Sequence, residues 1–326
     1  MLGGLKKFVK ARLFTEEHPF LMGLWYDRMR SKFIADNERH SRMSYAEIEE
    51  SIGRQYMRMF GRPLNWENPQ TYNEKIHVSK VYHATPLKTR LADKVAVREW
   101  VSERIGSEYL IPLLGVYDSF DEVDFDALPS QFVIKCSNDS GSVTLLKDKS
   151  RMNRELLRKK YAAFMSRNFA WMGWEMHYRD IKPKIMVEQY MGDAVSDYKF
   201  QCFSGEPYSC RVDYDRFGDH RRNVYNMNWE IMPVMKGLYK HPEQILPCPP
   251  EYDDMKRIVH ELSQGIEQVR VDLYLVDGRI YFGEMTLTNA NGFEYFVPDE
   301  WDYTYGSLWP FDNSIRAQVL AEHSKP

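Results

Sequence analysis

Apolar residues recur at helical spacing in the first third of this 326-residue chain. Val97, Val101 and Ile105 lie four positions apart, which places them on one face of a helix. Ser44 stands shortly before Glu47, and this spacing predicts the N-terminal cap of an earlier helix. The regions predicted to be helical are residues 1–65, with a break at 61–63, and residues 71–106.

From residue 109 onward the pattern changes to short runs rich in β-branched and aromatic residues, which predict strands. Helical patterns return at residues 151–169 and 252–264. Two turn signals, Ser204-Gly205-Glu206 and Asp277-Gly278, join neighbouring strands into hairpins. The predicted strands are residues 109–116, 132–136, 185–190, 197–203, 207–214, 222–227, 268–276 and 280–286.

The composition excludes several classes of protein. The chain is 43% hydrophobic and 28% charged, which is typical of a globular fold. Its net charge of −3 argues against nucleic acid as a partner. The four cysteines form no CxxC pair, so a zinc site is not expected. Without a secretory segment or a long apolar run, the sequence predicts a cytoplasmic protein.

The first 13 residues have an unusual charge pattern. They contain four cations and no acid, and their apolar residues recur at near-helical spacing. This pattern predicts a basic amphipathic helix in peripheral contact with an anionic membrane at its inner face. The alternative is a helix docked on the body of the protein. The cations are Lys6, Lys7, Lys10 and Arg12.

One predicted strand delivers a lysine to a loop of small polar residues. The run F-V-I-K-C-S-N-D-S-G-S-V, residues 132–143, places Lys135 before Ser140 and Gly141. Small residues allow backbone N–H groups to approach phosphate oxygens, and the lysine adds a positive charge. The alternative is an ordinary strand followed by a polar turn.

A second strand, I-M-V-E-Q-Y-M at residues 185–191, ends in Glu188. The residues that follow, Gln189, Tyr190 and Met191, form a hinge-like segment. Its backbone groups are candidates to bind an adenine edge, while apolar neighbours enclose the ring. A core strand with a solvated end is the alternative.

The strand V-S-D-Y-K-F-Q-C-F, residues 195–203, carries polar residues at alternate positions. The alternation puts Asp197 and Lys199 on one face together with Gln201. We expect the acid to bind a ribose hydroxyl and the lysine to bind a phosphate. An exposed ion pair across strands is the alternative.

The last hairpin joins R-V-D-L-Y-L, residues 270–275, to Y-F-G-E-M-T, residues 281–286. Arg270 and Asp272 share a face, and pairing brings Glu284 close to Asp272. Two neighbouring carboxylates repel each other unless a cation lies between them, so we predict Mg²⁺ bound to triphosphate oxygens. Arg270 would stabilise the charge of a transferring phosphoryl group.

The order of these four motifs resembles the ATP-grasp superfamily. Further runs are similar to the TupA-like ATP-grasp family of cell-surface polysaccharide and teichuronopeptide biosynthesis, and the resemblance covers roughly residues 65–300. These runs are N-E-K-I at 73–76, A-D-K-V-A-V-R-E-W-V at 92–101, I-G-x-E-Y-L-I-P-L-L-G-V-Y-D at 105–118 and F-G-E-M-T at 282–286.

The resemblance implies an α+β ATP-grasp fold in which two lobes clamp ATP. It implies ATP and Mg²⁺ as cofactors, with the metal on Asp272 and Glu284, and it adds Lys94 as a phosphate-binding lysine. The expected segments are a helical extension at 1–65, a substrate-side α/β region at 66–130, a small lobe at 131–190, and a large lobe with the metal site at 191–326.

The chain departs from the family pattern at one position. Many ATP-grasp enzymes carry E-x-N, but the second residue after Glu284 is Thr286. The third metal ligand is therefore open: Thr286, which we favour, Asn289, Asn291 or water. The two asparagines are equally typical of a turn.

The resemblance further implies an ATP-dependent ligase that activates a carboxylate as an acyl phosphate, which an amine then attacks. Lys199 and Arg270 would be the catalytic cations. A carboxylated sugar or sugar nucleotide and an amino acid or other amine are the expected partners, bound by Arg211, Asn289 and Asn291. Arg216, His220, Arg221 and Arg222 extend this cationic cluster, for which a mobile hairpin tip is the alternative.

Three other functions remain compatible with the sequence. A phosphotransferase acting on a sugar hydroxyl would have the same site. A glycosyltransferase of polysaccharide biosynthesis would use a sugar nucleotide and no ATP. A degenerate binding protein at the membrane is favoured slightly by the missing asparagine and opposed by the intact charged residues.

Overall fold

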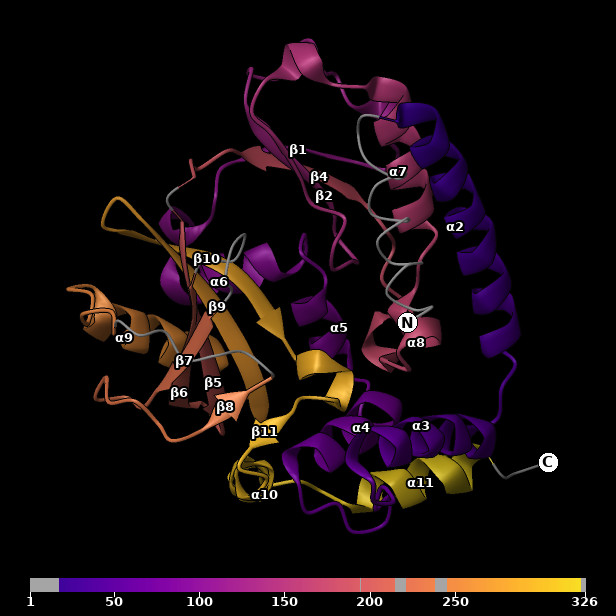
Figure 1. Ribbon diagram of the computed structural model, residues 1–326, viewed down its shortest axis with the longest axis vertical. Helices are drawn as coiled ribbons and strands as arrows, with labels where there is room; N and C mark the ends of the chain where they lie inside the picture. The colour runs from indigo at the N-terminus through magenta and orange to yellow at the C-terminus, as the bar shows by residue number, and fades with distance from the viewer. Residues whose placement is uncertain (1–17, 194, 215–220, 238–244, 324–326) are drawn as a thin grey trace, which may run out of the picture. The chain divides into compact units, whose positions relative to one another are not determined.

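The computed structural model describes residues 18–193, 195–214, 221–237 and 245–323 (Figure 1). The predicted membrane-surface helix at residues 1–13 lies outside these ranges, as do Arg216 and His220. None of the helices in the described ranges is both long and apolar enough to cross a membrane.

Two compact units divide the chain, and each is assembled from separated segments. The first contains the described residues within 1–43, 112–172 and 178–190. The second contains those within 44–111, 173–177 and 191–326. The units therefore cut across the four consecutive segments expected from the sequence.

The first unit is a four-stranded antiparallel sheet, in the order β1-β4-β2-β3, with helices on one face. Alternate residues of β2 and β4, such as Phe132, Ile134 and Val187, are buried against α7 and α2. The opposite face carries Lys135. The elements are α2 (Pro19–His40), β1 (Leu113–Tyr117), β2 (Phe132–Cys136), β3 (Thr144–Leu146), α7 (Arg154–Met165), α8 (Phe169–Met172) and β4 (Ile185–Gln189).

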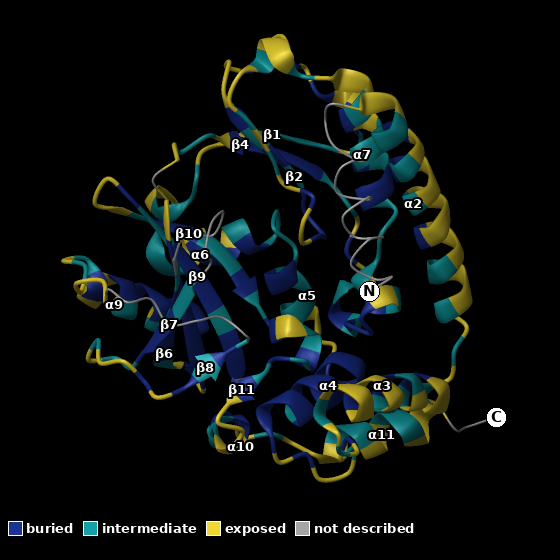
Figure 2. Cartoon of the chain, viewed as in Figure 1, coloured by how far each residue is buried: buried dark blue, intermediate teal, exposed yellow. Residues whose placement is uncertain are grey.

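The second unit is built on a five-stranded antiparallel sheet in the order β10-β9-β5-β6-β7. One face is apolar: Phe200, Val271 and Leu273 pack against α9, and these strands are deeply buried in Figure 2. The strands and this helix are β5 (Ser196–Phe203), β6 (Glu206–Tyr214), β7 (Arg221–Tyr225), α9 (Tyr252–Ser263), β9 (Gln268–Val276) and β10 (Arg279–Thr286).

Further helices surround this sheet. Ser44 and Glu47 form a reciprocal capping box at the start of α3, and left-handed Gly61 ends it, as predicted. The remaining elements are α3 (Tyr45–Phe60), α4 (Tyr72–Tyr82), α5 (Pro86–Ala92), α6 (Val97–Ile105), β8 (Met235–Lys236), β11 (Phe296–Val297), α10 (Glu300–Ser307) and α11 (Ser314–His323).

Two predictions about elements require correction. The helical region 71–106 is three helices, because Thr85 caps a new helix at Pro86 and residues 93–96 form a turn. The strand predicted at 109–116 begins only at Leu113, since Ser107–Tyr109 is a short 3-10 helix. The sequence pattern also did not predict α10, α11 and the three short strands β3, β8 and β11.

Two helical glycines of the second unit allow a matched test of packing. A Cβ on Gly306 would lie 2.2 Å from the Gln70 carbonyl oxygen, whereas one on Gly53 meets nothing within 4 Å. We expect Gly306→Ala to lower the free energy of unfolding by about 1–3 kcal/mol through overpacking. Gly53→Ala should raise it by roughly 0.5–1 kcal/mol. Denaturant unfolding measures both, and equal effects would contradict the close contact.

Candidate functional site

The face of the five-stranded sheet opposite α9 is lined by charged and polar side chains. They stand in register across four strands, because residues two apart on a strand point to the same face. Two adjacent rows result. The first row is Arg211, Lys199, Asp272 and Glu284, and the second is Ser209, Gln201, Arg270 and Thr286.

A bulge in β10 gives Glu284 its place on this face. Phe282 pairs with Leu273 and Glu284 pairs with Asp272, so Gly283 is an extra residue in the strand. The bulge shifts the alternation by one position, and Phe282 remains in the apolar core while Glu284 joins the charged row. A Cβ on Gly283 would lie 2.9 Å from the Asp272 carbonyl oxygen, so glycine suits this position.

Asp272 is the centre of the charged rows. Its Oδ2 accepts hydrogen bonds from Lys199 Nζ at 2.7 Å and from Arg270 Nη2 at 2.8 Å, and its Oδ1 accepts one from Arg270 Nε at 2.6 Å. Lys199 Nζ also donates to Asp197 Oδ2 at 2.5 Å. Arg270 Nη2 donates to Glu284 Oε1 at 2.9 Å.

The structure corrects one step of the sequence argument. Asp272 and Glu284 are neighbours, as predicted, but Arg270 already lies between them and relieves their repulsion. Repulsion alone therefore does not require a metal ion. The pairing instead holds Lys199, Arg270 and Asp272 in fixed positions, which is what a phosphate-binding surface needs.

The protonation state of this network follows from its pairing. Burial disfavours the Asp272 carboxylate, but Arg270 and Lys199 outweigh it and hold the pKa at about 2. Burial also opposes the charge on Arg270, yet Asp272 and then Glu284 raise its pKa above the usual value. Both groups are therefore ionised throughout the physiological pH range.

A second charged cluster continues the face toward β7 and β8. Arg211 Nη1 donates to Glu294 Oε1 at 3.1 Å, and Arg222 Nε donates to Asp213 Oδ1 at 2.6 Å. Lys236 Nζ lies 3.6 Å from Glu294 Oε2. Asp213, Lys236 and Glu294 were missed in the sequence, although R-V-D at 211–213 repeats R-V-D at 270–272 and was a usable signal.

The oxygen ligands on this face fit magnesium. Glu284 and Asp272 are cross-strand partners, and the Thr286 hydroxyl lies 3.1 Å from Glu284 Oε1. Carboxylate and hydroxyl oxygens are hard ligands of the kind Mg²⁺ prefers. Among the described residues no three acidic, histidine or cysteine side chains are placed to hold a metal ion together. Phosphate oxygens and water would therefore complete the coordination.

In the first unit, Lys135 and Glu188 lie together on the face of the four-stranded sheet opposite α7 and α2. Lys135 Nζ is 2.6 Å from Glu188 Oε2. The next residue along β4, Gln189, donates its backbone N–H to the Pro112 carbonyl at 3.0 Å. Lys147 Nζ stands 6.0 Å from the centroid of the Tyr190 ring. The predicted lysine and hinge residues of this unit are therefore neighbours on adjoining strands.

The loop after β2 is held from several sides. The Ser142 hydroxyl accepts the Cys136 N–H at 2.9 Å, and Asn138 Nδ2 donates to the Arg167 carbonyl at 2.9 Å. Arg167 pairs with the buried Asp139 and donates to the Ser140 carbonyl. These anchors shape the loop from inside and leave Ser140 and Gly141 exposed, with Gly141 at a φ of +98°.

The remaining predicted residues lie in the second unit. Lys94 is half-buried in the turn after α5, whose Leu91 shares a core with Phe282 of β10. Met191 is half-buried just beyond β4. Asn289 donates through Nδ2 to Gln201 Oε1 at 2.6 Å, and Asn291 accepts hydrogen bonds from Lys80.

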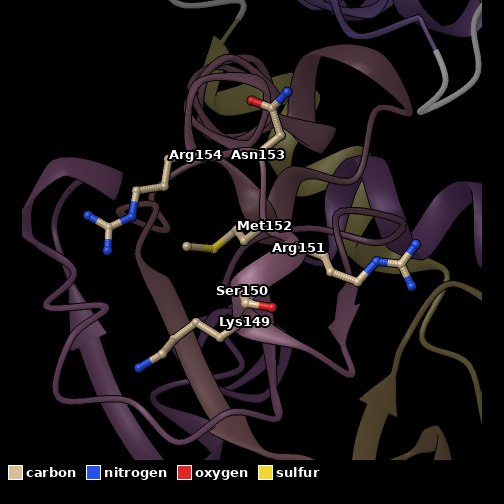
Figure 3. A pocket seen from close by; sticks show the side chains of 6 residues that line it. All are labelled: Lys149, Ser150, Arg151, Met152, Asn153 and Arg154. Carbon is tan, nitrogen blue, oxygen red and sulfur yellow. The ribbon is translucent and has the colours of Figure 1, made fainter.

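The hollow in Figure 3 contains none of the predicted site residues. It has a volume of 720 Å³ and is lined by residues 149–154 between β3 and α7. Lys149, on its wall, donates to the carbonyls of Phe125 and Leu128 and therefore serves the local fold. We assign no function to this hollow.

The fold and its charged sheet face define an α+β enzyme of the nucleotide-dependent kind. A family model described as TupA-like ATPgrasp matches residues 74–309. The chain belongs to this family, which confirms the resemblance predicted from the motifs. It also confirms the ATP-grasp fold.

Several solved ligases are similar to the chain at low identity. The D-alanine–D-alanine ligase from Bacillus anthracis is 15% identical with a TM-score of 0.40, covering 72% of this chain and 70% of that one. The L-amino acid ligase from Bacillus licheniformis is 14% identical with a TM-score of 0.42, covering 76% and 56%. The ligase PsnB with its minimal precursor, Mg and ADP is 11% identical with a TM-score of 0.37, covering 63% and 52%.

The chain thus spans little more than half of the length of two of these three enzymes. No curated protein matches the chain.

Arg167 offers a test of the loop after β2. Removing its guanidinium takes a positive charge away from the buried Asp139 and a donor away from the Ser140 carbonyl, so the loop should loosen and bind phosphate less well. We expect Arg167→Ala to weaken ATP binding on the order of tenfold, because a buried charged hydrogen bond is worth about 1.5–3 kcal/mol. Arg179→Ala removes an exposed arginine of the same unit that pairs with its neighbour Asp180. Calorimetry showing equal affinity in both variants would contradict the role of the loop.

Lys236 gives the network a pH dependence. Burial lowers its pKa to about 8, although Glu294 acts in the opposite direction. The unfolded chain keeps this proton up to about 10.5, so the free energy of unfolding should rise with pH between these values, by on the order of 1 kcal/mol per pH unit. Denaturant unfolding from pH 7 to 10 should show this slope reduced in Lys236→Met. An unchanged slope would contradict the assignment.

Proposed function

We propose that this protein is a carboxylate–amine ligase that uses ATP to activate a carboxylate as an acyl phosphate and joins it to an amine. The observation that carries the proposal is the two rows of charged and polar side chains on the five-stranded sheet. Lys199 and Arg270 both donate hydrogen bonds to Asp272, so they are held in place to neutralise a triphosphate.

The chain supplies ligands for each part of the nucleotide in this proposal. Lys135 and the loop at Ser140 and Gly141 would contact phosphates, as would Lys94. The hinge from Glu188 to Met191 would bind adenine, and Asp197 the ribose. Asp272, Glu284 and Thr286 would hold Mg²⁺, which supplies charge neutralisation on the phosphates when bound.

The carboxylate substrate would bind at the cationic end of the face. Arg211, Arg222 and Lys236 gather here around Asp213 and Glu294. Such a cluster suits a uronic acid or the diphosphate of a sugar nucleotide. Asn289 and Asn291 would contact the acid or the amine.

In this proposal the protein forms no covalent bond with the substrate. Lys199 and Arg270 align and neutralise the transferring phosphoryl group, and the arginine cluster holds the acceptor carboxylate for attack. The amine then displaces phosphate from the acyl carbon. The product would be an amino acid joined by an amide bond to a carboxylated sugar of a surface polysaccharide, made at or near the inner face of the membrane.

Glu284→Gln tests the nucleotide and metal assignment. The amide retains the size of the side chain and a hydrogen bond to Arg270 but removes a charged oxygen ligand, so ATP binding should lose most of its Mg²⁺ dependence. Calorimetry with and without Mg²⁺ measures this. Glu261→Gln, an exposed acid on α9 behind the apolar face, should behave as the parent protein. Unaltered Mg²⁺-dependent binding in Glu284→Gln would refute the metal assignment.

The substrate is tested by ADP release with glucuronate or galacturonate and a pool of amino acids. The ligase requires ADP release that depends on both the acid and the amine. ADP release without an amine, with a phosphorylated sugar as product, would establish the phosphotransferase instead. Turnover of a UDP-sugar without ATP would establish the glycosyltransferase.

A further inference from the structure

A short segment after β10 has an unusual backbone. Ala290, Asn291 and Gly292 are three consecutive residues with positive φ, at 47°, 56° and 81°. Glycine adopts this left-handed conformation freely, whereas alanine and asparagine do so at a cost in free energy. Such strain persists only where the surrounding structure enforces it, and it concentrates at functional sites.

One face of the buried helix α4 enforces this conformation. Asn73, His77 and Lys80 stand at positions i, i+4 and i+7, which places them side by side on the helix. Lys80 Nζ donates to Asn291 Oδ1 at 2.7 Å and to its carbonyl oxygen at 3.0 Å. Asn73 and Glu294 exchange two hydrogen bonds, at 2.9 and 3.0 Å.

His77 explains the glycine at the end of the turn. Its ring centroid lies 4.6 Å from that of Phe293, and a Cβ on Gly292 would lie 2.8 Å from its Nε2. Position 292 therefore accepts no larger residue while the ring keeps its place. Helix α4 therefore holds the turn through the contacts of His77 and through the hydrogen bonds of Asn73 and Lys80.

Burying the ammonium group of Lys80 at this position costs free energy of desolvation. Lys80 is only 1% exposed, and burial lowers its pKa to about 7 although Glu175 acts in the opposite direction. An apolar side chain of similar length would avoid the cost of desolvation. A methionine lacks the pair of hydrogen bonds to Asn291 and the attraction to Glu175.

The segment from Thr288 to Glu294 connects two parts of the polar sheet face. It begins two residues after Thr286, and Asn289 donates to Gln201 Oε1 within the second row. It ends at Glu294, the partner of Arg211. Gln201 donates its own amide to the Val269 carbonyl, so its oxygen faces Asn289 and Asn289 Oδ1 remains buried without a hydrogen bond in the described residues.

We propose that Lys80 is a positioning residue, which with Asn73 and His77 holds residues 288–294 in a strained left-handed turn and so places Asn289 and Glu294 at the polar face. This role rests on the proposed function only for its catalytic consequence. Asn289 then bonds Gln201 and Glu294 bonds Arg211, so the turn fixes both of these side chains on the polar face.

Lys80→Met tests the proposal, and α4 contains a matched control. Lys75 also donates two hydrogen bonds to backbone carbonyls, those of Gly306 and Trp309, both at 2.8 Å. Hydrogen exchange should accelerate on the order of tenfold in peptides that cover residues 287–295 of Lys80→Met. This factor corresponds to the free-energy cost of holding one alanine in the left-handed conformation. Lys75→Met should leave those amides unchanged.

A second substitution separates positioning from packing. Ala290 is exposed, so Ala290→Gly removes the strain without removing a buried group. In the double variant Lys80→Met/Ala290→Gly, exchange of residues 287–295 should return to within about threefold of the parent, since the turn no longer needs enforcement. Thermal unfolding of each variant checks that the fold is retained.

Three results would overturn the proposal. These are unchanged exchange in Lys80→Met, equal acceleration in Lys75→Met, and acceleration that Ala290→Gly fails to reverse, which would make Lys80 a packing residue. The exchange measurement needs no substrate, so it remains decisive if the parent protein shows no acid- and amine-dependent ADP release. Absence of that ADP release would reject the proposed ligase activity and leave the positioning role of Lys80 standing.

Where turnover is present, Lys80→Met should raise KM for the acid or amine and leave KM for ATP within about twofold.

Discussion

The buried carboxylate of Asp272 is the interaction on which the polar sheet face depends. Arg270 and Lys199 stand on adjacent strands and would repel each other and resist burial without the anion between them. With it, all three side chains are held in fixed positions on the sheet. Fixed charges in such a setting act on a bound phosphate far more strongly than mobile surface charges.

The geometry of the strands places these paired charges and their polar neighbours on one face of the sheet. Antiparallel register aligns residues of four strands in rows, and the two-residue alternation separates these rows from the apolar core against α9. The bulge at Gly283 is the one irregularity that the arrangement requires. It moves Glu284 onto the charged face and keeps Phe282 and Met285 in the core.

The second unit positions its polar residues through elements that are distant in sequence. Helix α4 precedes the sheet by more than a hundred residues, yet its Asn73, His77 and Lys80 hold the segment that follows β10. The first unit uses the same principle on a smaller scale, where Arg167 holds the loop after β2. In both, a cationic side chain donates a hydrogen bond to a backbone carbonyl of the loop that it holds.

The sequence by itself determined the local elements and the identity of the charged residues. Alternation and turn dipeptides placed β2, β4, β5, β6 and β9 within a residue or two, since these signals are short-range. The motif order indicated the ATP-grasp superfamily, and further runs such as N-E-K-I at 73–76 indicated the family. The sequence also predicted Lys199, Arg270, Asp272 and Glu284 as site residues.

Only the tertiary structure decided how those residues pair. Arg270 bonds both Asp272 and Glu284, because its side chain reaches both across adjacent strands. Lys236, Glu294 and Lys80 carry no local pattern that distinguishes them from surface charges. Their burial and their partners depend on contacts between segments far apart in the chain, which periodicity along the sequence does not encode.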